Sequence, residues 1–349
     1  LPFQLGKHIW LQQSFINSFR IDYLSPTIYT TDILITIYIL LNAKKIWTSI
    51  KKIFKKSTGL LLLALLIFNL WASSFNPVTA FTWLRMAEYL FLFLALANTP
   101  HLLKKISTPF IASLVLIMAI ASIQLVKQSS IGGILYFLGE RPLSINLPNI
   151  AEIKFRTLTL LRPYGTFSHP NSLAGYLLVS FLILSFISKS KILKTLLILT
   201  LLITFSKAAI LAFIFVEIFK LRFPQTLLLA FLFTLAPFII HRKLIPDWLI
   251  KSFSFRQFMI IPTFAILARS WLAGVGLQQY IKALAGNLAP SQISLYTLQP
   301  VHNILLLIIS ELGLIFVVIL LIIAIKTIDK KILRNAQFQK LASIVILTG

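Results

Sequence analysis

Long runs of apolar residues, separated by polar segments, dominate the chain. At about 1.5 Å per residue, about 20 helical residues cross a hydrocarbon core about 30 Å thick. Only a helix satisfies its own backbone in lipid, and no alternating strand pattern indicates a barrel, so these runs predict membrane helices. The predicted spans are 28–41, 58–76, 78–98, 108–126, 171–188, 195–205, 207–220, 224–240 and 303–325, with a tenth that begins near Leu341.

Composition supports the same fold class. The chain is 58% hydrophobic with a mean hydropathy of +0.90, whereas soluble domains are about 45–50% apolar. We therefore predict an all-α polytopic integral membrane protein, a single transmembrane domain over residues 1–349, with about 10 transmembrane helices. Because the sequence begins with Leu1 and ends inside a fresh apolar run, we expect it to be a truncated piece of a longer chain.

The distribution of basic residues predicts the topology. The formal net charge is +24, but Lys and Arg concentrate in short loops between apolar runs, which favours a topological role over nucleic-acid binding. The dense short loops are 42–56, 99–107, 189–194, 220–223 and 326–340. By the positive-inside rule they are cytoplasmic, and the long loops 1–27, 127–170 and 241–302 face outward. Loops can alternate between the two faces in this way only if residues 195–205 and 207–220 are separate spans. The topology therefore favours separate spans over two broken pieces that meet at Ser206-Lys207.

A polar cluster stands directly before the span at 171–188. The stretch RPYGTFSHPNSLAGYL, residues 162–177, contains Arg162, His169 and Asn171. Pro170-Asn171 predicts a helix start, with Asn as a cap or Pro in the first turn. A well-made helix start alone would explain Pro and Asn. It does not explain Arg162 and His169 at the same place, and a helix N-terminus beside such groups favours an anion site.

Two more cations lie near the same predicted face. Lys207, in TFSKAAILAF, either extends to lipid headgroups or faces a phosphate. Arg256, in KSFSFRQF, is either solvated and in contact with lipid phosphate, or part of the same site. The surrounding segment 255–272 predicts an amphipathic, interfacial helix, and GVGLQQY (274–280) predicts a tight loop turn.

A second motif, PVHNILLLIISELGLI (300–315), repeats the order proline, histidine, asparagine and span. His302 and Asn303 either form another helix cap or contribute to the site. Glu311 is an acid inside an apolar helix, which is costly unless paired. It either belongs to the substrate site or forms a structural ion pair with Arg85, although Arg85 can also pair with Glu88 at i, i+3.

The outward-facing candidates are therefore mainly cationic. The outward carboxylates are scattered, so the ligand clusters that metals need are not predicted. There are no cysteines, which excludes a thiol nucleophile and disulfides. We predict a site without metal or cofactor that binds a phosphate-bearing, lipid-linked substrate at the membrane boundary.

Taken in order, these motifs resemble the O-antigen ligase and O-antigen polymerase superfamily of bacterial membrane glycosyltransferases. The matching pieces are RPYGTFSHPNSLAGYL, TFSKAAILAF, the arginine of SFSFRQF, ARSWLAGVGLQQY (268–280) and PVHNILLLIISELGLI, within about residues 75–349. The resemblance implies a C-type glycosyltransferase fold in the bacterial cytoplasmic (inner) membrane. It also implies an active site on the extracytoplasmic face.

The resemblance further implies glycan transfer from undecaprenyl diphosphate to an acceptor hydroxyl on a lipid, glycan or protein, as in lipopolysaccharide biosynthesis. His302 and Arg256 match the family's histidine and one of its arginines, and Lys207 stands where the family has a second arginine. These three are the expected catalytic residues. Lysine keeps the charge but loses the bidentate fork that fits phosphate. Arg162, His169, Asn171, Asn303 and Glu311 are the expected substrate-binding residues.

Other functions stay open on the sequence alone. Ligase, polymerase and protein O-oligosaccharyltransferase share these motifs. A flippase or transporter for lipid-linked glycans is a further alternative, although internal repeats and mid-membrane binding residues, which are typical of transporters, are absent from the sequence. A scaffolding membrane protein would not need histidine-containing motifs at two helix starts.

Overall fold

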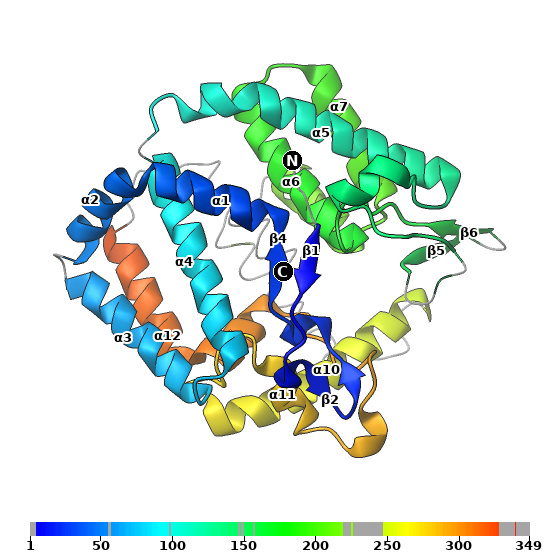
Figure 1. Cartoon of the computed structure of the whole chain (residues 1–349). Coiled ribbons are helices and arrows are strands. Elements are labelled where there is room, and N and C mark those ends of the chain that lie inside the picture. The colour runs from blue at the N-terminus through cyan, green and yellow to red at the C-terminus, as the bar shows by residue number, and fades with distance from the viewer. Residues whose placement is uncertain are drawn as a thin grey trace.

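The computed structural model describes residues 5–54, 57–97, 99–145, 147, 150–155, 158–218, 225, 247–327 and 339. Helices dominate this part of the chain (Figure 1). They are α1 (Thr30–Leu41), α2 (Ala43–Phe54), α3 (Ser57–Ala72), α4 (Pro77–Ala97), α5 (Leu102–Lys127), α6 (Pro170–Ile187), α7 (Lys191–Ile203), α8 (Lys207–Phe213), α10 (Asp247–Ser270), α11 (Tyr280–Ala285) and α12 (Ile304–Thr327). A π-helical turn, Ile214–Ile218, continues α8.

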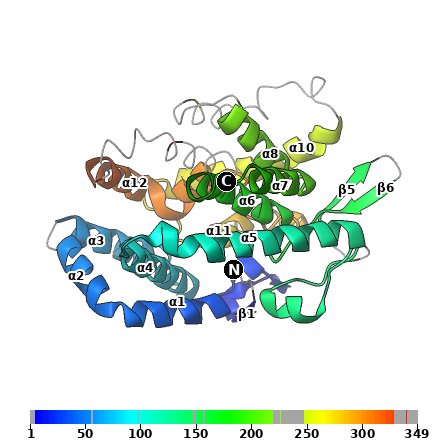
Figure 2. The same ribbon diagram turned by 90° about the horizontal axis from the view of Figure 1, so that it is seen from above.

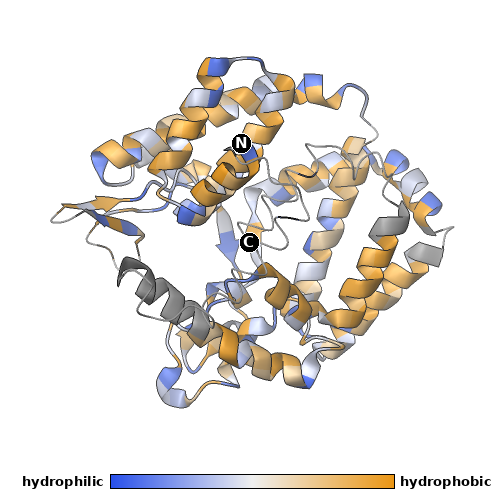
Figure 3. Cartoon of the chain, turned by 180° about the vertical axis from the view of Figure 1, so that it is seen from behind, coloured by the Kyte–Doolittle hydropathy of each residue, from blue (hydrophilic) through white to orange (hydrophobic). Residues whose placement is uncertain are grey.

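The structure is mostly helical and is compatible with the predicted membrane protein. Among the described residues, four helices are long and apolar enough to cross a membrane, namely α4, α5, α6 and residues Ile304–Ile323 of α12. α1 and α2, which are bent by 80° at Asn42, would together make a fifth. Their surfaces carry large exposed apolar side chains, as expected for lipid contact, and Figure 3 shows the hydrophobic character of these helices.

The predicted count of about ten spans is not confirmed. The predicted spans at 195–205 and 207–220 form the separate short helices α7 and α8, and Phe205 lies between them with a left-handed backbone (φ 50°). The 13 residues of α7 would reach about 20 Å, less than a hydrocarbon core of about 30 Å. The predicted spans at 224–240, apart from Gln225, and from Leu341 lie outside the described residues, as do the loop 220–223 and most of 326–340.

The long predicted loops contain strands that the all-α expectation omitted. β1 (Gly6–His8) pairs with β4 (Thr27–Tyr29), β2 (Phe15–Ile16) with β3 (Phe19–Arg20), and β5 (Glu152–Phe155) with β6 (Leu158–Leu161), all antiparallel. Short 3₁₀ helices lie between the strands, at Gln12–Ser14 (η1) and Asp22–Leu24 (η2), before β5, at Gly133–Leu138 (η3), and between α11 and α12, at Pro290–Gln292 (η6). These two-stranded ribbons satisfy backbone groups in segments that lack an apolar helical period.

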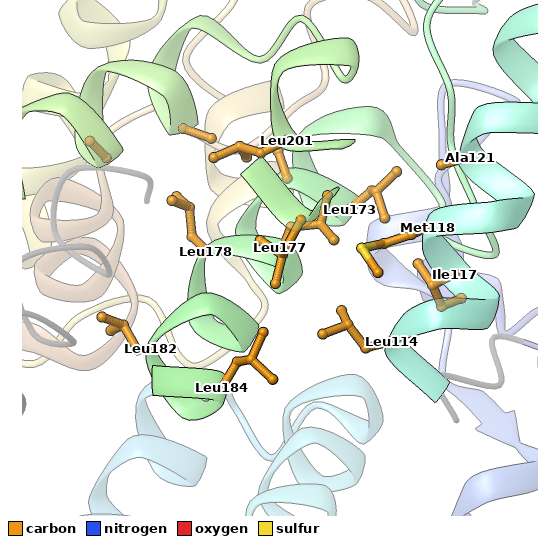
Figure 4. Close-up of a cluster of buried hydrophobic side chains, with 14 of the residues drawn as sticks. Leu114, Ile117, Met118, Ala121, Leu173, Leu177, Leu178, Leu182, Leu184 and Leu201 are labelled. Atoms are coloured by element: carbon orange, nitrogen blue, oxygen red, sulfur yellow. The ribbon is translucent and has the colours of Figure 1, made fainter. Parts of the chain in front are cut away.

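Two apolar cores hold the molecule together. The first lies between α5, α6, α7 and α8, with Leu114, Leu173, Leu177 and Leu201 fully or almost fully buried (Figure 4). The second joins the N-terminal segment, through Ile21 and Leu24, to α10, α11 and the segment that ends at Val301. Seen from above, α1, α4 and α5 lie on one side of the molecule, and α8 and α10 lie on the other (Figure 2).

Helix α12 is broken at Gly313, which has a non-helical backbone (φ 80°, ψ 158°). The loop between α10 and α11 fills the break. Leu314 N–H donates to Trp271 O at 2.7 Å, and Val275 N–H donates to Ser310 O at 2.8 Å. This exchange satisfies backbone groups that the break would otherwise leave unpaired inside an apolar segment.

The glycines at this junction are required by close backbone contact. A Cβ added at Gly274 would lie 2.4 Å from Glu311 O, and one at Gly313 would lie 2.3 Å from Leu272 O. The buried Asn69 of α3 fixes the same place, because its Nδ2 donates to Glu311 O and its Oδ1 accepts from Leu277 N. The predicted turn at 274–280 is confirmed, and its role is to seal the broken helix.

Candidate functional site

The candidate site begins at the N-terminus of α6. His169 is the N-cap, and its Nδ1 accepts a hydrogen bond from Asn171 N at 3.1 Å. Pro170 occupies the first helical turn, where a missing N–H costs nothing. The helix start was predicted, but the capping side chain is His169 and not Asn171. This bond makes Nδ1 the acceptor, so the neutral ring carries its proton on Nε2.

Arg162 ties this helix start to the turn between α7 and α8. Its Nε donates to Thr204 O at 2.9 Å, and its Nη2 donates to Asn171 Oδ1 at 2.7 Å. Both acceptors are neutral, so the positive charge of the guanidinium is held in place by partners that do not cancel it. Burial lowers the pKa of Arg162, but an arginine remains charged near neutral pH.

Further positive groups surround His169. Burial lowers the pKa of His169 to about 4, and Arg162, His302 and Arg141 lower it as well. Arg141, whose Nη1 donates to Ser168 O at 3.0 Å, was not singled out from the sequence. His302, more than a hundred residues away along the chain, is therefore close enough to act on the same imidazole. The arrangement suits an anion, because a phosphate would pair with Arg141 and Arg162, which remain charged near neutral pH.

Comparison with known proteins found no matching family model, no matching curated protein and no matching solved structure. The function proposed for this chain therefore rests on the geometry of the site and on the motifs of the sequence.

The acid next to Arg141 in the sequence is bonded to the backbone and to α5. Glu140 is buried, and its carboxylate accepts hydrogen bonds from Ile131 N and Gly132 N, both at 2.7 Å, and from Gln124 Nε2 at 2.8 Å. Gln124 in turn accepts from the backbone of residues 164 and 165 through its Oε1. Residues 131, 132, 140, 164 and 165 are thereby tied to α5. A buried glutamine in an apolar helix was the signal in the sequence for this anchor.

The second motif is built differently from the first. α12 begins at Ile304, and Asn303 Oδ1 accepts from Leu306 N at 3.0 Å. Asn303 is thus the cap, which leaves His302 exposed beside the helix start. The two motifs share a sequence order, but in the first the histidine caps the helix and in the second the asparagine does.

Lys207 lies close to this group along the chain. It is an exposed residue in the first turn of α8, three residues after Thr204, whose carbonyl accepts from Arg162. α8 packs on α6 within the first apolar core. The backbone of Arg256 belongs to α10, so the helix predicted over 255–272 is confirmed and begins earlier, at Asp247. The Arg256 side chain lies outside the described residues.

Glu311 accepts hydrogen bonds from the backbone of the segment that leads into α11. Its carboxylate Oε1 accepts from Tyr280 N at 3.4 Å, and its carbonyl accepts from Gly276 N at the break in α12. The ion pair considered with Arg85 is replaced by another, because Arg85 Nη2 lies 2.6 Å from Asp32 Oδ2. Within the described residues, no three His, Asp or Glu side chains are grouped so that they could hold a metal ion.

The depressed pKa of His169 predicts a pH-dependent stability. Its ordinary value is 6.5 and its folded value is about 4, so between these values the unfolded chain binds more protons than the folded one. Stability is therefore complete above the unfolded value and decreases as the pH falls toward the folded value. His169→Asn keeps a capping acceptor. We expect its thermal unfolding midpoint to fall less than that of wild type when the pH is lowered from about 7 to about 5.

The measurement is thermal unfolding of both proteins in detergent. His8→Asn is a control, because it also replaces a histidine by asparagine, and the ring of His8 bonds Thr27 in the β1–β4 ribbon, away from the N-terminus of α6. Equal pH profiles for wild type and His169→Asn would contradict the expected titration.

Proposed function

We propose that the protein transfers a glycan from undecaprenyl diphosphate to an acceptor hydroxyl at the extracytoplasmic face of a bacterial cytoplasmic membrane. The observation that carries this proposal is that Arg141 bonds Ser168 and Arg162 bonds Asn171, which places two guanidinium groups beside the N-terminus of α6. Positive groups, neutral hydrogen-bond partners and a helix N-terminus together favour a bound diphosphate. The motif resemblance supplies the donor and the reaction.

The chemistry follows from these groups. The acceptor oxygen attacks the anomeric carbon, its bond to that carbon forms, and the bond from carbon to the diphosphate oxygen breaks. Negative charge grows on the leaving diphosphate, where Arg162, Arg256 and Lys207 would stabilise it without a metal. The acceptor proton passes to His302, which acts as the general base. His169, with its proton on Nε2, would donate a hydrogen bond to the diphosphate.

The test is incubation of the purified protein in detergent or vesicles with an undecaprenyl-diphosphate-linked glycan and separate lipid, glycan and protein acceptors. Transfer should persist after chelation by EDTA, since the proposed stabilisation of charge is entirely by side chains. A strict requirement for added Mg²⁺ would contradict the mechanism. Absence of transfer to every acceptor, with the donor intact, would contradict the function, and the acceptor used would separate ligase, polymerase and protein-modifying activity.

A flippase would be favoured by an open, ligand-accessible break in a membrane helix. α12 is broken, but the loop 271–277 and Asn69 form hydrogen bonds with the carbonyl and N–H groups at the break. These groups are therefore already bonded within the protein. This observation favours the enzyme.

Position 207 gives a graded prediction. Lys207→Arg should preserve or raise transfer, because arginine adds a fork that matches phosphate oxygens. Lys207→Ala should lower kcat by about 10²-fold, as expected for one lost electrostatic contact to a leaving group. Lys191→Ala, in the first turn of α7, is the matched lysine control. Equal rates for Lys207→Ala and wild type would remove Lys207 from the site.

A further inference from the structure

A cavity of about 610 Å³ lies apart from the cationic cluster, between the N-terminal segment and the α11–η6 segment. Its volume falls within the range of about 300–1,000 Å³ that is typical of ligand pockets. One wall is formed by Gln12, Gln13, Phe15 and Asn17, and Lys282 lies on the other. Nothing in the proposed transfer reaction uses these residues.

The floor of this cavity is rigid. Ile16, Leu288 and Ile293 line it and also pack against the second apolar core. The wall is fixed too, because Ser14 Oγ donates to Leu24 O at 3.0 Å and Gln278 Nε2 donates to Tyr23 O at 2.7 Å. The tip of the hairpin is a tight turn in which Asn17 and Ser18 both have positive φ. The cavity is therefore pre-formed.

The lining chemistry selects the ligand class. The primary amides of Gln12, Gln13 and Asn17 each donate and accept hydrogen bonds, and the Lys282 ammonium donates only. Phe15, which is 45% exposed, offers an apolar ring face. Groups that both donate and accept, beside one aromatic face, match a ligand that carries many hydroxyls on an apolar ring frame. A lipid chain would form no hydrogen bonds with the three amides, whereas the hydroxyls of a sugar would.

We propose that this cavity binds a segment of an oligosaccharide, several sugars away from the reacting bond. The choice of ligand rests on the proposed function. The second apolar core connects the two places, since it contains both the floor of the cavity and Val301, the residue before His302. A glycan held at its diphosphate end by the cationic cluster would thus have a second contact on the same rigid body, which would select among glycans by their distal sugars.

Two substitutions test the cavity. Gly286→Phe should fill it, because Gly286 has an ordinary backbone (φ −70°) and an added Cβ would meet only its own helix, no closer than 3.5 Å. Phe15→Ala should remove the ring face. The matched control is Phe19→Ala, since Phe19 pairs with Ile16 in the same hairpin and does not line the cavity.

The experiment measures binding of each purified variant to an array of soluble oligosaccharides, without a lipid-linked donor. We expect wild type and Phe19→Ala to bind the same glycans with equal affinity. Gly286→Phe and Phe15→Ala should bind them with an affinity at least about tenfold lower. Failure of wild type to bind any glycan, or equal binding by Gly286→Phe, would overturn the proposal.

The outcome is separable from the fate of the proposed function. His302→Ala should keep array binding and lose transfer. Array binding that depends on the cavity, with no transfer by wild type, would sustain the subsite and refute glycan transfer. Transfer by wild type that is unchanged in Gly286→Phe, with equal array binding, would refute the subsite alone.

Discussion

Alanine at His302 is expected to lower the rate of glycan transfer by about 10²–10⁴-fold, the contribution of a positioned general base. His302 stands beside the start of α12, while Asn303 supplies the cap that orders that helix. Removing the imidazole therefore leaves the fold of α12 intact. Because the acceptor proton would have no protein group to receive it, kcat should fall while the KM for the lipid-linked donor changes little.

The control for this variant is His101→Asn. His101 is the exposed N-cap residue of α5, and its backbone is left-handed (φ 52°), a conformation that asparagine tolerates. It should retain wild-type transfer. Both variants should have the elution volume in detergent and the unfolding midpoint of wild type. An effect on transfer is then an effect on catalysis and not on folding. Unchanged transfer by His302→Ala would remove the general base, and a rise in KM with unchanged kcat would assign His302 to donor binding instead.

The parts of the fold that depend on local pattern were predicted, including the ends of apolar runs at residues 41 and 205, whereas the break inside α12 was not. Apolar runs identify α4, α5 and α6 because each is continuous over a membrane-spanning length. Asn42 and Phe205 interrupt other apolar stretches through local backbone geometry. Gly313 breaks α12 because a distant loop supplies partners for its backbone, and no local pattern contains that information.

The same distinction applies to the site. Arg162 and Asn171 were predicted to lie together because they flank one helix start, and they form a direct hydrogen bond. Arg141 was missed, since its position depends on Gln124 and Glu140 holding a loop whose partners are distant in sequence. Glu311 was predicted either to belong to the substrate site or to form a structural ion pair with Arg85. Arg85 pairs with Asp32, and the contacts of Glu311 lie at the junction with α11.

Alanine at Gly274 is expected to produce a large loss of stability. Its backbone is left-handed (φ 71°), which costs a residue with a Cβ about 1–2 kcal/mol. That Cβ would also lie 2.4 Å from Glu311 O, a main-chain atom that cannot rotate away. Overpacking typically costs a further 1–3 kcal/mol or so, so a loss of about 3 kcal/mol is expected, a large part of a total that is about 5–15 kcal/mol in most proteins.

Two other glycines separate the causes of that loss. Gly132 also has a positive φ (81°), but an added Cβ meets nothing within 4 Å, so Gly132→Ala should show backbone strain alone. Gly175 lies within α6 with open space around it, and Gly175→Ala should be neutral or slightly stabilising. Unfolding midpoints in one detergent should therefore fall in the order Gly175→Ala, Gly132→Ala, Gly274→Ala. If Gly274→Ala were no worse than Gly132→Ala, the loop would not rest on the α12 backbone, and the break at Gly313 would have to be satisfied by other groups.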